Sequence, residues 1–540
     1  MVSLWSRKQD TPDGGDQPNR EDDERQSSQH YRDRDRDRDP DERTRLLPRE
    51  HTGYLNPDDP AVSPYNLWSI RALRGLSSLF LAISFIWWTF LLVSIFVSPP
   101  MMHTRGSGFF AFSYTTLTVG YLVTGLMFFV VPSKPMTIWG VVLAVFLLVD
   151  MCIILGVPRI RVEEGWVGIA SVVWATLISF YNILQNYFVA WGKREEEERL
   201  TGREETRRSL REWLAVLVQT VVMAILGILV ILFTATLILR ARDASLPAPG
   251  KQYYVNSNNY RVHLACVGNI TGDKIDGTAS SRRRPTVLLE GGEEPIEHTL
   301  QPFIDAAYKN GTIDRYCYWD RPGLGWSDNA PSPYSAGMAA DALSEALALA
   351  GEEGPWVIAS AGMGGIYSRI FASRHLLEIE GLLLIDTLHE DYLDKVGSPG
   401  WGFLLWLRGV LSPLGLDRLA GAIFKGRTRE DRVYGRSAYQ TGRFIKAKLQ
   451  ESLVAGSMTA SEVQTARHVQ IADTPLVVVS SGVEVRKSKK WAKTQEDLTT
   501  VTKNLQDWDV VQGAPHEVWK TLAGRTILER RLRQLVKGHK

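Results

Sequence analysis

The sequence predicts a multi-pass α-helical membrane domain followed by an α/β domain with a mostly parallel sheet. Five long apolar runs crowd between residues 76 and 239, and short apolar strands alternate with helices from about residue 250 onward. The first 65 residues are polar, and the 540-residue chain is long enough for several folding units. We therefore expect a tail over 1–65, a five-helix transmembrane domain over 66–242 and a soluble domain over 250–540.

Composition excludes some classes of function. The formal net charge is only +2, so no overall field favours a nucleic-acid partner. Cys152, Cys266 and Cys317 are too few for a disulfide framework, and their spacing matches no zinc site. We expect no cofactor and no metal, and the apolar runs make membrane lipids the main surroundings of the helices.

The N-terminal tail is expected to be disordered, because its alternating Arg32–Asp39 tract and polar neighbours can bury little apolar surface. No apolar segment near Met1 resembles a cleavable signal peptide. Glu42 followed by Leu46-Leu47 resembles the acidic dileucine signal that clathrin adaptors bind, although two leucines without a role are the alternative. Such a signal favours a vacuolar or endosomal membrane, while plasma, endoplasmic reticulum and mitochondrial membranes remain alternatives.

Each of the five apolar runs reaches the roughly 20 residues that cross the hydrocarbon layer of a membrane. They cover about 76–98, 109–131, 136–157, 166–190 and 213–239. The connections are short, and Pro132–Pro135 makes a tight hairpin between the second and third runs. This part of the chain is therefore expected to be a bundle of five membrane-spanning helices.

The orientation of the bundle follows from the basic residues of its loops. The tail and loops 132–135 and 191–212 share one side and are rich in Lys and Arg, whereas the opposite loops offer only Arg105, Arg159 and Arg161. We expect a cytosolic N-terminus and a lumenal or extracellular domain after residue 240. Two glycosylation sequons, at Asn269 and Asn310, agree with that side.

Polar residues inside the runs have two interpretations. Asp150, Asn182, Gln185, Asn186 and Gln219 could line a transport path, which would make the protein a transporter or channel with a passive ectodomain. The amides could instead form hydrogen bonds between helices. A single acidic residue, together with a large domain outside the membrane, favours the second interpretation.

The soluble part shows a regular succession of strands. We expect an opening hairpin of two strands, followed by a series of buried strands. A helix over 336–351 precedes the strand that begins at Trp356, and a basic helix follows the last strand. The expected strands are Tyr253–Asn256, Tyr260–Val267, Thr286–Glu290, Asp314–Trp319, a strand that begins at Trp356, Gly381–Ile385, Pro475–Ser480 and Trp508–Gln512.

The apolar run that begins at Trp356 leads into a turn of small residues and then a helix, the local pattern of a nucleophile elbow over Trp356–Arg369. Such a turn needs small residues two before and two after the nucleophile, and Ser360 and Gly364 fill these places. Gly362 stands where the nucleophile belongs. The chain thus keeps the elbow and lacks its reactive side chain, unless Ser360, which is expected to face the sheet, acts as a displaced nucleophile.

This order of elements resembles the α/β-hydrolase fold over about 250–540. The most specific motif is Asp320–Asp328, which is similar to the DRPGxGxSD turn of the haloalkane-dehalogenase, epoxide-hydrolase and proline-iminopeptidase type. The resemblance implies a helical lid over 387–470, with an apolar helix over Trp401–Leu416 near the membrane. The whole chain also resembles a family of fungal integral membrane proteins in which a multi-pass region precedes a hydrolase-like domain.

The resemblance also implies roles for single residues. Gly291 and Met363 would form the oxyanion hole, and His516, on the loop after the final strand, would be the catalytic histidine. The acid behind that histidine would be Asp386 or Glu484. Either carboxylate could instead cap a helix or pair with an arginine.

The cysteines of the soluble part allow a further expectation. Cys266 and Cys317 lie in the second and fourth strands, which are neighbours in α/β-hydrolases. In an oxidising lumen they could form a disulfide. The alternative is two small buried apolar side chains.

Three functions remain at this point. The first is a pseudo-hydrolase that binds a small-molecule or protein ligand without cleaving it. The second is an active membrane-bound serine hydrolase on a lipid, ester or peptide substrate, with a displaced nucleophile. The third is the transporter or channel. Gly362 favours the first over the second, because a hydrogen atom cannot attack a carbonyl group.

Overall fold

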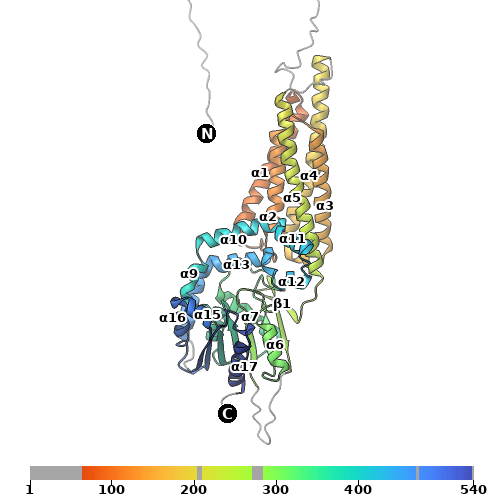
Figure 1. The fold of residues 1–540 in the computed structure, drawn as a ribbon. Coiled ribbons are helices and arrows are strands. Elements are labelled where there is room, and N and C mark those ends of the chain that lie inside the picture. The colour runs from red at the N-terminus through yellow and green to blue at the C-terminus, as the bar shows by residue number, and fades with distance from the viewer. Residues whose placement is uncertain (1–63, 203–209, 270–283, 470–472, 538–540) are drawn as a thin grey trace, which may run out of the picture. The chain divides into compact units, whose positions relative to one another are not determined.

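The computed structural model describes residues 64–202, 210–269, 284–469 and 473–537 (Figure 1). These residues belong to one compact unit. Some predicted features lie outside them: the tail over 1–63, the sorting residues Glu42, Leu46 and Leu47, and Thr271 of the first sequon.

Five long helices follow a short 3₁₀ turn, η1 (Pro64–Asn66). All five are long and apolar enough to cross a membrane, in agreement with the five predicted runs. They are α1 (Trp68–Phe96), α2 (Phe109–Met127), α3 (Lys134–Gly156), α4 (Pro158–Thr201) and α5 (Leu210–Ala244).

The ends of these helices follow from local sequence. The Ser133 hydroxyl accepts a hydrogen bond from the Met136 amide and so caps α3, with Pro135 in its first turn. The 44-residue α4 bends at Gly165, which has a φ of +61°. It ends where Gly202 adopts a left-handed conformation.

Hydrogen bonds join four of the five polar residues of the predicted spans across helices, whereas the buried Asn182 amide, expected to do the same, has no hydrogen-bond partner among the described residues. Three amides and one carboxylate of the bundle have partners on other helices or on the loop before α3. These pairs are Gln185 with Ser77, Asn186 with Thr137, Gln219 with Ser133, and Asp150 with Tyr114. The contacts account for these polar groups as links between helices.

The soluble domain is built on an eight-stranded sheet with the order β1-β2-β4-β3-β5-β6-β7-β8. Antiparallel pairing is confined to β1 with β2 and β2 with β4, and the other pairs are parallel. The strands are β1 (Lys251–Val255), β2 (Tyr260–Val267), β3 (Thr286–Glu290), β4 (Tyr316–Trp319), β5 (Trp356–Ala361), β6 (Ile379–Ile385), β7 (Leu476–Ser481) and β8 (Leu505–Val511).

Parallel pairing brings three loops to one edge of the sheet. Glu290, the last residue of β3, pairs with Ser360 of β5, and Ala361 pairs with Ile385, the last residue of β6. The segments that follow these strands therefore meet at their carboxyl ends, where parallel α/β sheets place their ligand sites.

Helices cover both faces of the sheet, because alternate strand residues point to opposite sides. Leu288 and Ile358 belong to one apolar core, and Val287 and Val357 belong to the other. The first core contains residues of α7 (Ala336–Ala350), α8 (Gly364–Arg374) and α14 (Ala460–Val469), and the second contains residues of α6 (Gln301–Lys309) and α17 (Leu522–Lys537).

A set of helices is inserted between β6 and β7. These inserted helices are α9 (Leu393–Val396), α10 (Pro399–Leu411), α11 (Leu416–Phe424), α12 (Arg429–Val433), α13 (Gly442–Val454) and α14, with short turns η2 (Glu390–Tyr392), η3 (Ser412–Leu414), η4 (Ala438–Gln440) and η5 (Ala455–Thr459). Figure 1 shows α10 to α13 between the long helices and the sheet. Accordingly, α10 contacts α2, α11 and α12 contact α5, and α13 contacts α1.

The expected single helix over Trp401–Leu416 is divided in the structure. Helix α10 ends at Leu411, and α11 begins only at Leu416. Pro413 cannot donate a backbone hydrogen bond to continue the helix, and Gly415 has a φ of +60°. The chain therefore turns at this point.

The remaining elements complete the last part of the domain. Helices α15 (Gly482–Lys487) and α16 (Lys489–Leu498) follow β7, and the turn η6 (Val518–Lys520) precedes α17.

Cys266 of β2 lies directly opposite Cys317 of β4, with the Cα atoms 4.0 Å apart and the two sulfur atoms bonded. Cys152 in α3 is a free, exposed thiol.

Candidate functional site

The site lies at the carboxyl edge of the sheet, around the sharp turn between β5 and α8. Gly362 occupies the apex of this turn with a φ of +50°, in the left-handed region that glycine tolerates. A Cβ atom at Gly364 would lie 2.4 Å from the Gly291 carbonyl oxygen, and one at Gly365 would lie 2.4 Å from the Thr387 Cβ. The small residues of the turn thus let its backbone approach both neighbouring loops.

Asp386 and His516 meet beside this turn. The Nδ1 atom of His516 is 2.6 Å from Asp386 Oδ2. The other carboxylate oxygen, Oδ1, accepts hydrogen bonds from the Ser481 amide at 2.9 Å and from the Trp491 indole at 3.0 Å. Because Asp386 is fully buried and held by three donors, its carboxylate fixes the orientation of the imidazole ring.

Two other residues considered from the sequence lie elsewhere. Glu484 is in the first turn of α15, where Ser481 caps its amide and Lys487 pairs with its carboxylate. The Ser360 side chain is fully buried, and its hydroxyl bonds to that of Ser368 on α8. Of the two predicted acids, the structure therefore places Asp386 against the histidine.

Glu293 fills the space in front of the elbow. Its Oε1 accepts a hydrogen bond from the Met363 amide at 2.9 Å, and its Oε2 lies 3.8 Å from His516 Nε2. A Cβ atom at Gly362 would be only 2.4 Å from Glu293 Oε2. One carboxylate thus occupies both the predicted oxyanion position and the space that a nucleophile side chain would need.

The charges of these groups depend on one another. Burial opposes the imidazolium form, but hydrogen bonds to Asp386 and Glu293 outweigh it and raise the pKa of His516 to about 10. Burial likewise opposes ionisation of Glu293, but His516 outweighs it, with help from Lys448 and the Met363 amide, and lowers the pKa of Glu293 to about 2. Because 53% of the Glu293 side chain is exposed, solvent screens its attraction to His516.

Arg321, from the Asp320–Asp328 motif, supports the loop that carries Glu293. Its guanidinium donates to the carbonyl oxygens of Gly291, at 2.7 Å, and Gly292. It also pairs with the buried Glu290 carboxylate at 3.2 Å. Burial raises the pKa of Glu290 to about 7 although Arg321 opposes that change. Through these bonds, Arg321 fixes the Gly291-Gly292 loop, which was predicted to form one side of the oxyanion hole.

Two clusters of His and carboxylate side chains among the described residues have the donor types that could hold a metal. They are His263 with Glu297 and Asp320, and His389 with Glu390 and Asp497. In each cluster the histidine is already hydrogen-bonded to a carboxylate, at 2.9 Å from Asp320 and 2.8 Å from Asp497. In the first cluster both Glu297 carboxylate oxygens and Asp320 Oδ1 are buried without a hydrogen-bond partner among the described residues.

The sequence did not lead to a prediction of the role of Glu293, or of the hydrogen bonds by which Arg321 fixes the Gly291-Gly292 loop. Glu293 directly follows Gly291-Gly292, so the sequence does place a carboxylate beside the predicted oxyanion loop. That signal is weak, because acidic residues in loops are usually exposed to solvent and without a specific partner. The direction of the Glu293 side chain depends on contacts with Met363, in the turn after β5, and with His516, in the loop after β8.

Comparison with known proteins places these observations in a family. Residues 42–266 match the family described as "Region of unknown function (DUF2417)". The Schizosaccharomyces pombe protein named "Uncharacterized protein C23C11.06c" is 35% identical over 532 residues, covering 92% of this chain and 97% of that protein. The Saccharomyces cerevisiae "Uncharacterized vacuolar membrane protein YNL115C" is 25% identical over 383 residues, covering 62% of this chain and 59% of that protein.

Solved structures resemble the soluble half. MGS-M2, an α/β hydrolase from a deep-sea metagenome, has 12% identity and a TM-score of 0.39, covering 54% of this chain and 98% of its own. The enol-lactonase of Burkholderia xenovorans has 14% identity and a TM-score of 0.34, covering 53% of this chain and 100% of its own. The strand order, with β2 beside β4, agrees with the α/β-hydrolase-like fold expected for this domain.

Proposed function

This chain belongs to the family of the S. pombe protein C23C11.06c, and we propose that its hydrolase-like domain is a pseudo-hydrolase. In this proposal the domain binds a small-molecule or protein ligand at the carboxyl edge of the sheet without cleaving it. The observation that carries the proposal is the Glu293 carboxylate, which bonds the Met363 amide in front of Gly362.

Three features of the site oppose serine-type hydrolysis. Gly362 offers no atom that can attack a carbonyl carbon. The Met363 amide already binds a carboxylate, whose charge would repel the oxyanion that forms during acyl transfer. His516, with a pKa of about 10, carries its proton at neutral pH and cannot accept one as a general base.

The test uses the full-length protein in detergent and a fluorophosphonate probe, which labels activated serines. We expect no labelling of the wild-type protein under conditions that label a known serine hydrolase in the same tube. Labelling that disappears in Ser360→Ala would overturn the proposal and establish a displaced serine nucleophile.

A second candidate function rests on the two oxygens of Glu293. Oε1 is held by the Met363 amide while Oε2 faces His516, and about half of the side chain is exposed. An ionised carboxylate in this position could attack a saturated electrophilic carbon, forming a bond from Glu293 to that carbon while the leaving group departs as an anion with the bonding electron pair. Water would then attack the carbonyl carbon of the resulting Glu293 ester, returning the carboxylate and releasing an alcohol and a proton.

Isotope incorporation separates the two candidates. Turnover through a Glu293 ester in ¹⁸O-water would place ¹⁸O in the Glu293 carboxylate, which mass spectrometry of the peptide detects. As a pseudo-hydrolase, the protein incorporates no more ¹⁸O at Glu293 than at the neighbouring Glu294. Enrichment at Glu293 alone would replace the first proposal by the second.

We also propose that the soluble domain lies in the vacuolar lumen. The S. cerevisiae relative is named a vacuolar membrane protein, and the five apolar helices fit a multi-pass membrane protein. The loop charges predict a cytosolic N-terminus, and the Cys266–Cys317 disulfide is typical of an oxidising, non-cytosolic compartment.

A further inference from the structure

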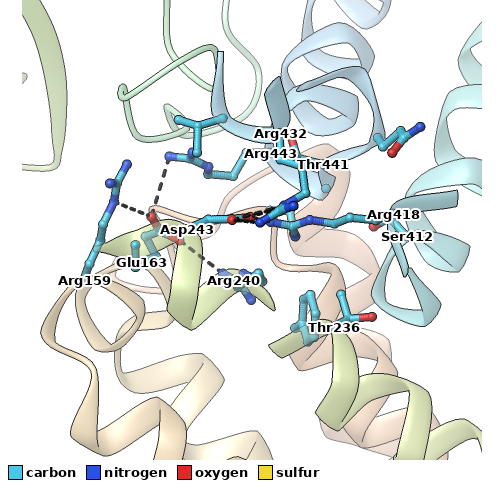
Figure 2. A pocket seen from close by; sticks show the side chains of 16 residues that line it. Arg159, Glu163, Thr236, Arg240, Asp243, Ser412, Arg418, Arg432, Thr441 and Arg443 are labelled. Atoms are coloured by element: carbon cyan, nitrogen blue, oxygen red, sulfur yellow. Dashed lines mark hydrogen bonds and ion pairs between the residues drawn. The ribbon is translucent and has the colours of Figure 1, made fainter. Parts of the chain in front are cut away.

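A cavity rich in arginine lies where the long helices meet the inserted helices (Figure 2). It is lined by the first turn of α4, the last turns of α5, and residues of α11, α12 and the start of α13. Five guanidinium groups face it, from Arg159, Arg240, Arg418, Arg432 and Arg443. These arginines come from segments far apart in the sequence, so the cavity is a product of the tertiary fold.

Carboxylates balance only part of this positive charge. Asp243 pairs with Arg432 at 2.6 Å and with Arg418. Glu163 receives Arg240 at 3.1 Å, Arg159 at 3.4 Å and Arg443 at 3.6 Å, as Figure 2 shows. Arg240 also pairs with Glu164 at 2.7 Å. Five guanidinium groups thus share three carboxylates, which leaves an excess of two positive charges.

This excess positive charge lies among side chains that are largely removed from water. The side chains of Glu163, Asp243 and Arg418 are each at most 9% exposed. Charge removed from water is costly unless another charge and hydrogen bonds compensate it. An anion entering the cavity would supply that compensation.

Unused donors are present for such an anion. The Arg418 Nε–H has no hydrogen-bond partner among the described residues, and neither has the hydroxyl of Thr236, which is 1% exposed. Both residues line the cavity. A guanidinium fork and a hydroxyl are the groups that recognise phosphate oxygens through paired, charge-assisted hydrogen bonds.

The volume and position of the cavity restrict the class of ligand that it can bind. The cavity volume is about 50 Å³, which at roughly 10–15 Å³ per water-sized group admits a phosphate group but no acyl chain or nucleobase. It lies at the ends of two helices that are apolar enough to cross a membrane. Exposed apolar side chains on α10 and α11 include Trp401, Phe403, Leu404, Leu416, Ile423 and Phe424. A surface of this kind is typical of helices at a membrane interface.

We propose that this arginine cavity binds a phosphate group, supplied either by the headgroup of an anionic phospholipid or by a soluble phosphate compound. Bound phosphate would connect α4 and α5 of the bundle to α11 and α12 of the inserted helices. This cavity is separate from the site around Gly362. The phosphate proposal can therefore be tested independently of the proposed pseudo-hydrolase function.

The experiment uses the full-length protein in nanodiscs and follows its thermal unfolding by tryptophan fluorescence. One arm adds inorganic phosphate to phosphatidylcholine discs in phosphate-free buffer, and sodium chloride at equal ionic strength serves as the salt control. The other arm replaces part of the phosphatidylcholine by phosphatidic acid. A ligand that binds the folded protein raises the unfolding temperature in proportion to its occupancy.

We expect stabilisation in at least one arm, and the arm that responds identifies the source of the phosphate. Arg418→Gln should weaken the apparent affinity by about tenfold or more, since a hydrogen bond to a charged group contributes roughly 1.5–3 kcal/mol. Arg408→Gln, on α10 and outside the cavity lining, is the matched control and should bind as the wild type does.

Two results would overturn the proposal. One is a wild-type protein that neither phosphate nor phosphatidic acid stabilises more than sodium chloride does. The other is an equal loss of affinity in Arg408→Gln and Arg418→Gln. If Arg418→Gln fails to fold, Arg443→Gln takes its place, because Arg443 contributes a longer ion pair, at 3.6 Å from Glu163.

Discussion

At the scale of single residues, one carboxylate decides the character of the hydrolase-like site. Gly362 removes the nucleophile, but a glycine by itself would leave the oxyanion position open to a ligand. Glu293 closes that position by accepting the Met363 amide hydrogen and facing His516. The remaining members of the site, His516 and Asp386, keep the contact that a catalytic pair would have.

Restoring the nucleophile should therefore require two changes. Gly362→Ser alone should stay unlabelled by a fluorophosphonate probe, because a Cβ atom there would lie 2.4 Å from Glu293 Oε2. Gly362→Ser with Glu293→Ala should become labelled, since the histidine also loses the carboxylate that holds its proton.

The matched control replaces Glu293→Ala by Glu294→Ala and should remain unlabelled. Adding His516→Ala to the labelled variant should remove the label, because serine activation needs a base. A single Gly362→Ser variant that labels as strongly as the double variant would show that Glu293 does not block the site.

The raised pKa of His516 predicts a particular dependence of stability on pH. Its value is about 10 in the folded protein, against 6.5 for an ordinary histidine. The stabilisation from the protonated ring is fully present below about pH 6.5 and decreases as the pH rises towards 10. We expect the difference in unfolding temperature between wild type and His516→Gln to be largest near pH 6 and to become smaller as the pH rises through about 10.

Thermal unfolding in a series of buffers measures this difference. His468→Gln, an exposed histidine of α14, serves as the control and should show no such trend. A difference that grows with pH would mean that His516 is stabilised in its neutral form.

At the scale of elements, short motifs act as supports between neighbouring loops. Arg321 follows β4 and holds the loop after β3 through the carbonyl oxygens of Gly291 and Gly292. The break between α10 and α11 has a comparable effect, because it turns α11 so that Arg418 reaches Asp243 of α5.

Removing the Arg321 guanidinium should destabilise the soluble domain. Arg321→Met leaves the buried Glu290 carboxylate without its cation, a change that costs about 3–5 kcal/mol for a buried pair. The unfolding temperature measured by tryptophan fluorescence should fall accordingly. Glu290→Gln added to Arg321→Met should recover part of the loss, and a double variant no more stable than the single one would exclude this ion pair as the cause.

At the scale of the whole molecule, several independent features agree on one orientation. The loop charges predict a cytosolic N-terminus, and the disulfide and the two sequons are features typical of the opposite, non-cytosolic side of a membrane. Asn269 and Asn310 are both exposed on the soluble domain.

Glycosylation tests this orientation. Endoglycosidase treatment of the protein from fungal cells should increase its electrophoretic mobility, and Asn269→Gln or Asn310→Gln should reduce that shift. A C-terminal tag should be protected from protease in sealed vesicles and become accessible after detergent is added. A tag that is cleaved before detergent is added would reverse the topology.

The N-terminal tail carries the corresponding prediction about sorting. If Glu42 with Leu46-Leu47 is bound by clathrin adaptors, Leu46→Ala with Leu47→Ala should move a fluorescent fusion from the vacuolar membrane towards the cell surface. Replacement of Leu55, a leucine of the same tail, is the control. An unchanged location of the double variant would leave the two leucines without a sorting role.

The sequence alone determined the elements whose signals are local. Apolar length predicted the five long helices, and the Thr286–Glu290 strand was predicted with the bounds that β3 has. The elbow and the empty nucleophile position could be located because they depend on small residues at fixed spacing around Gly362. The role of His516, with Asp386 or Glu484 as its acid, was predicted only from the resemblance to α/β-hydrolases.

Only the tertiary structure decided what occupies the space between these elements. The choice of Asp386 over Glu484, the direction of Glu293 and the meeting of Arg159 with Arg418 join residues that lie far apart in the chain. No periodicity or spacing records such contacts, because each depends on how loops and inserted helices pack after the strands have paired. The charge of a site is set by those neighbours, so both proposed ligand sites became visible only in the folded molecule.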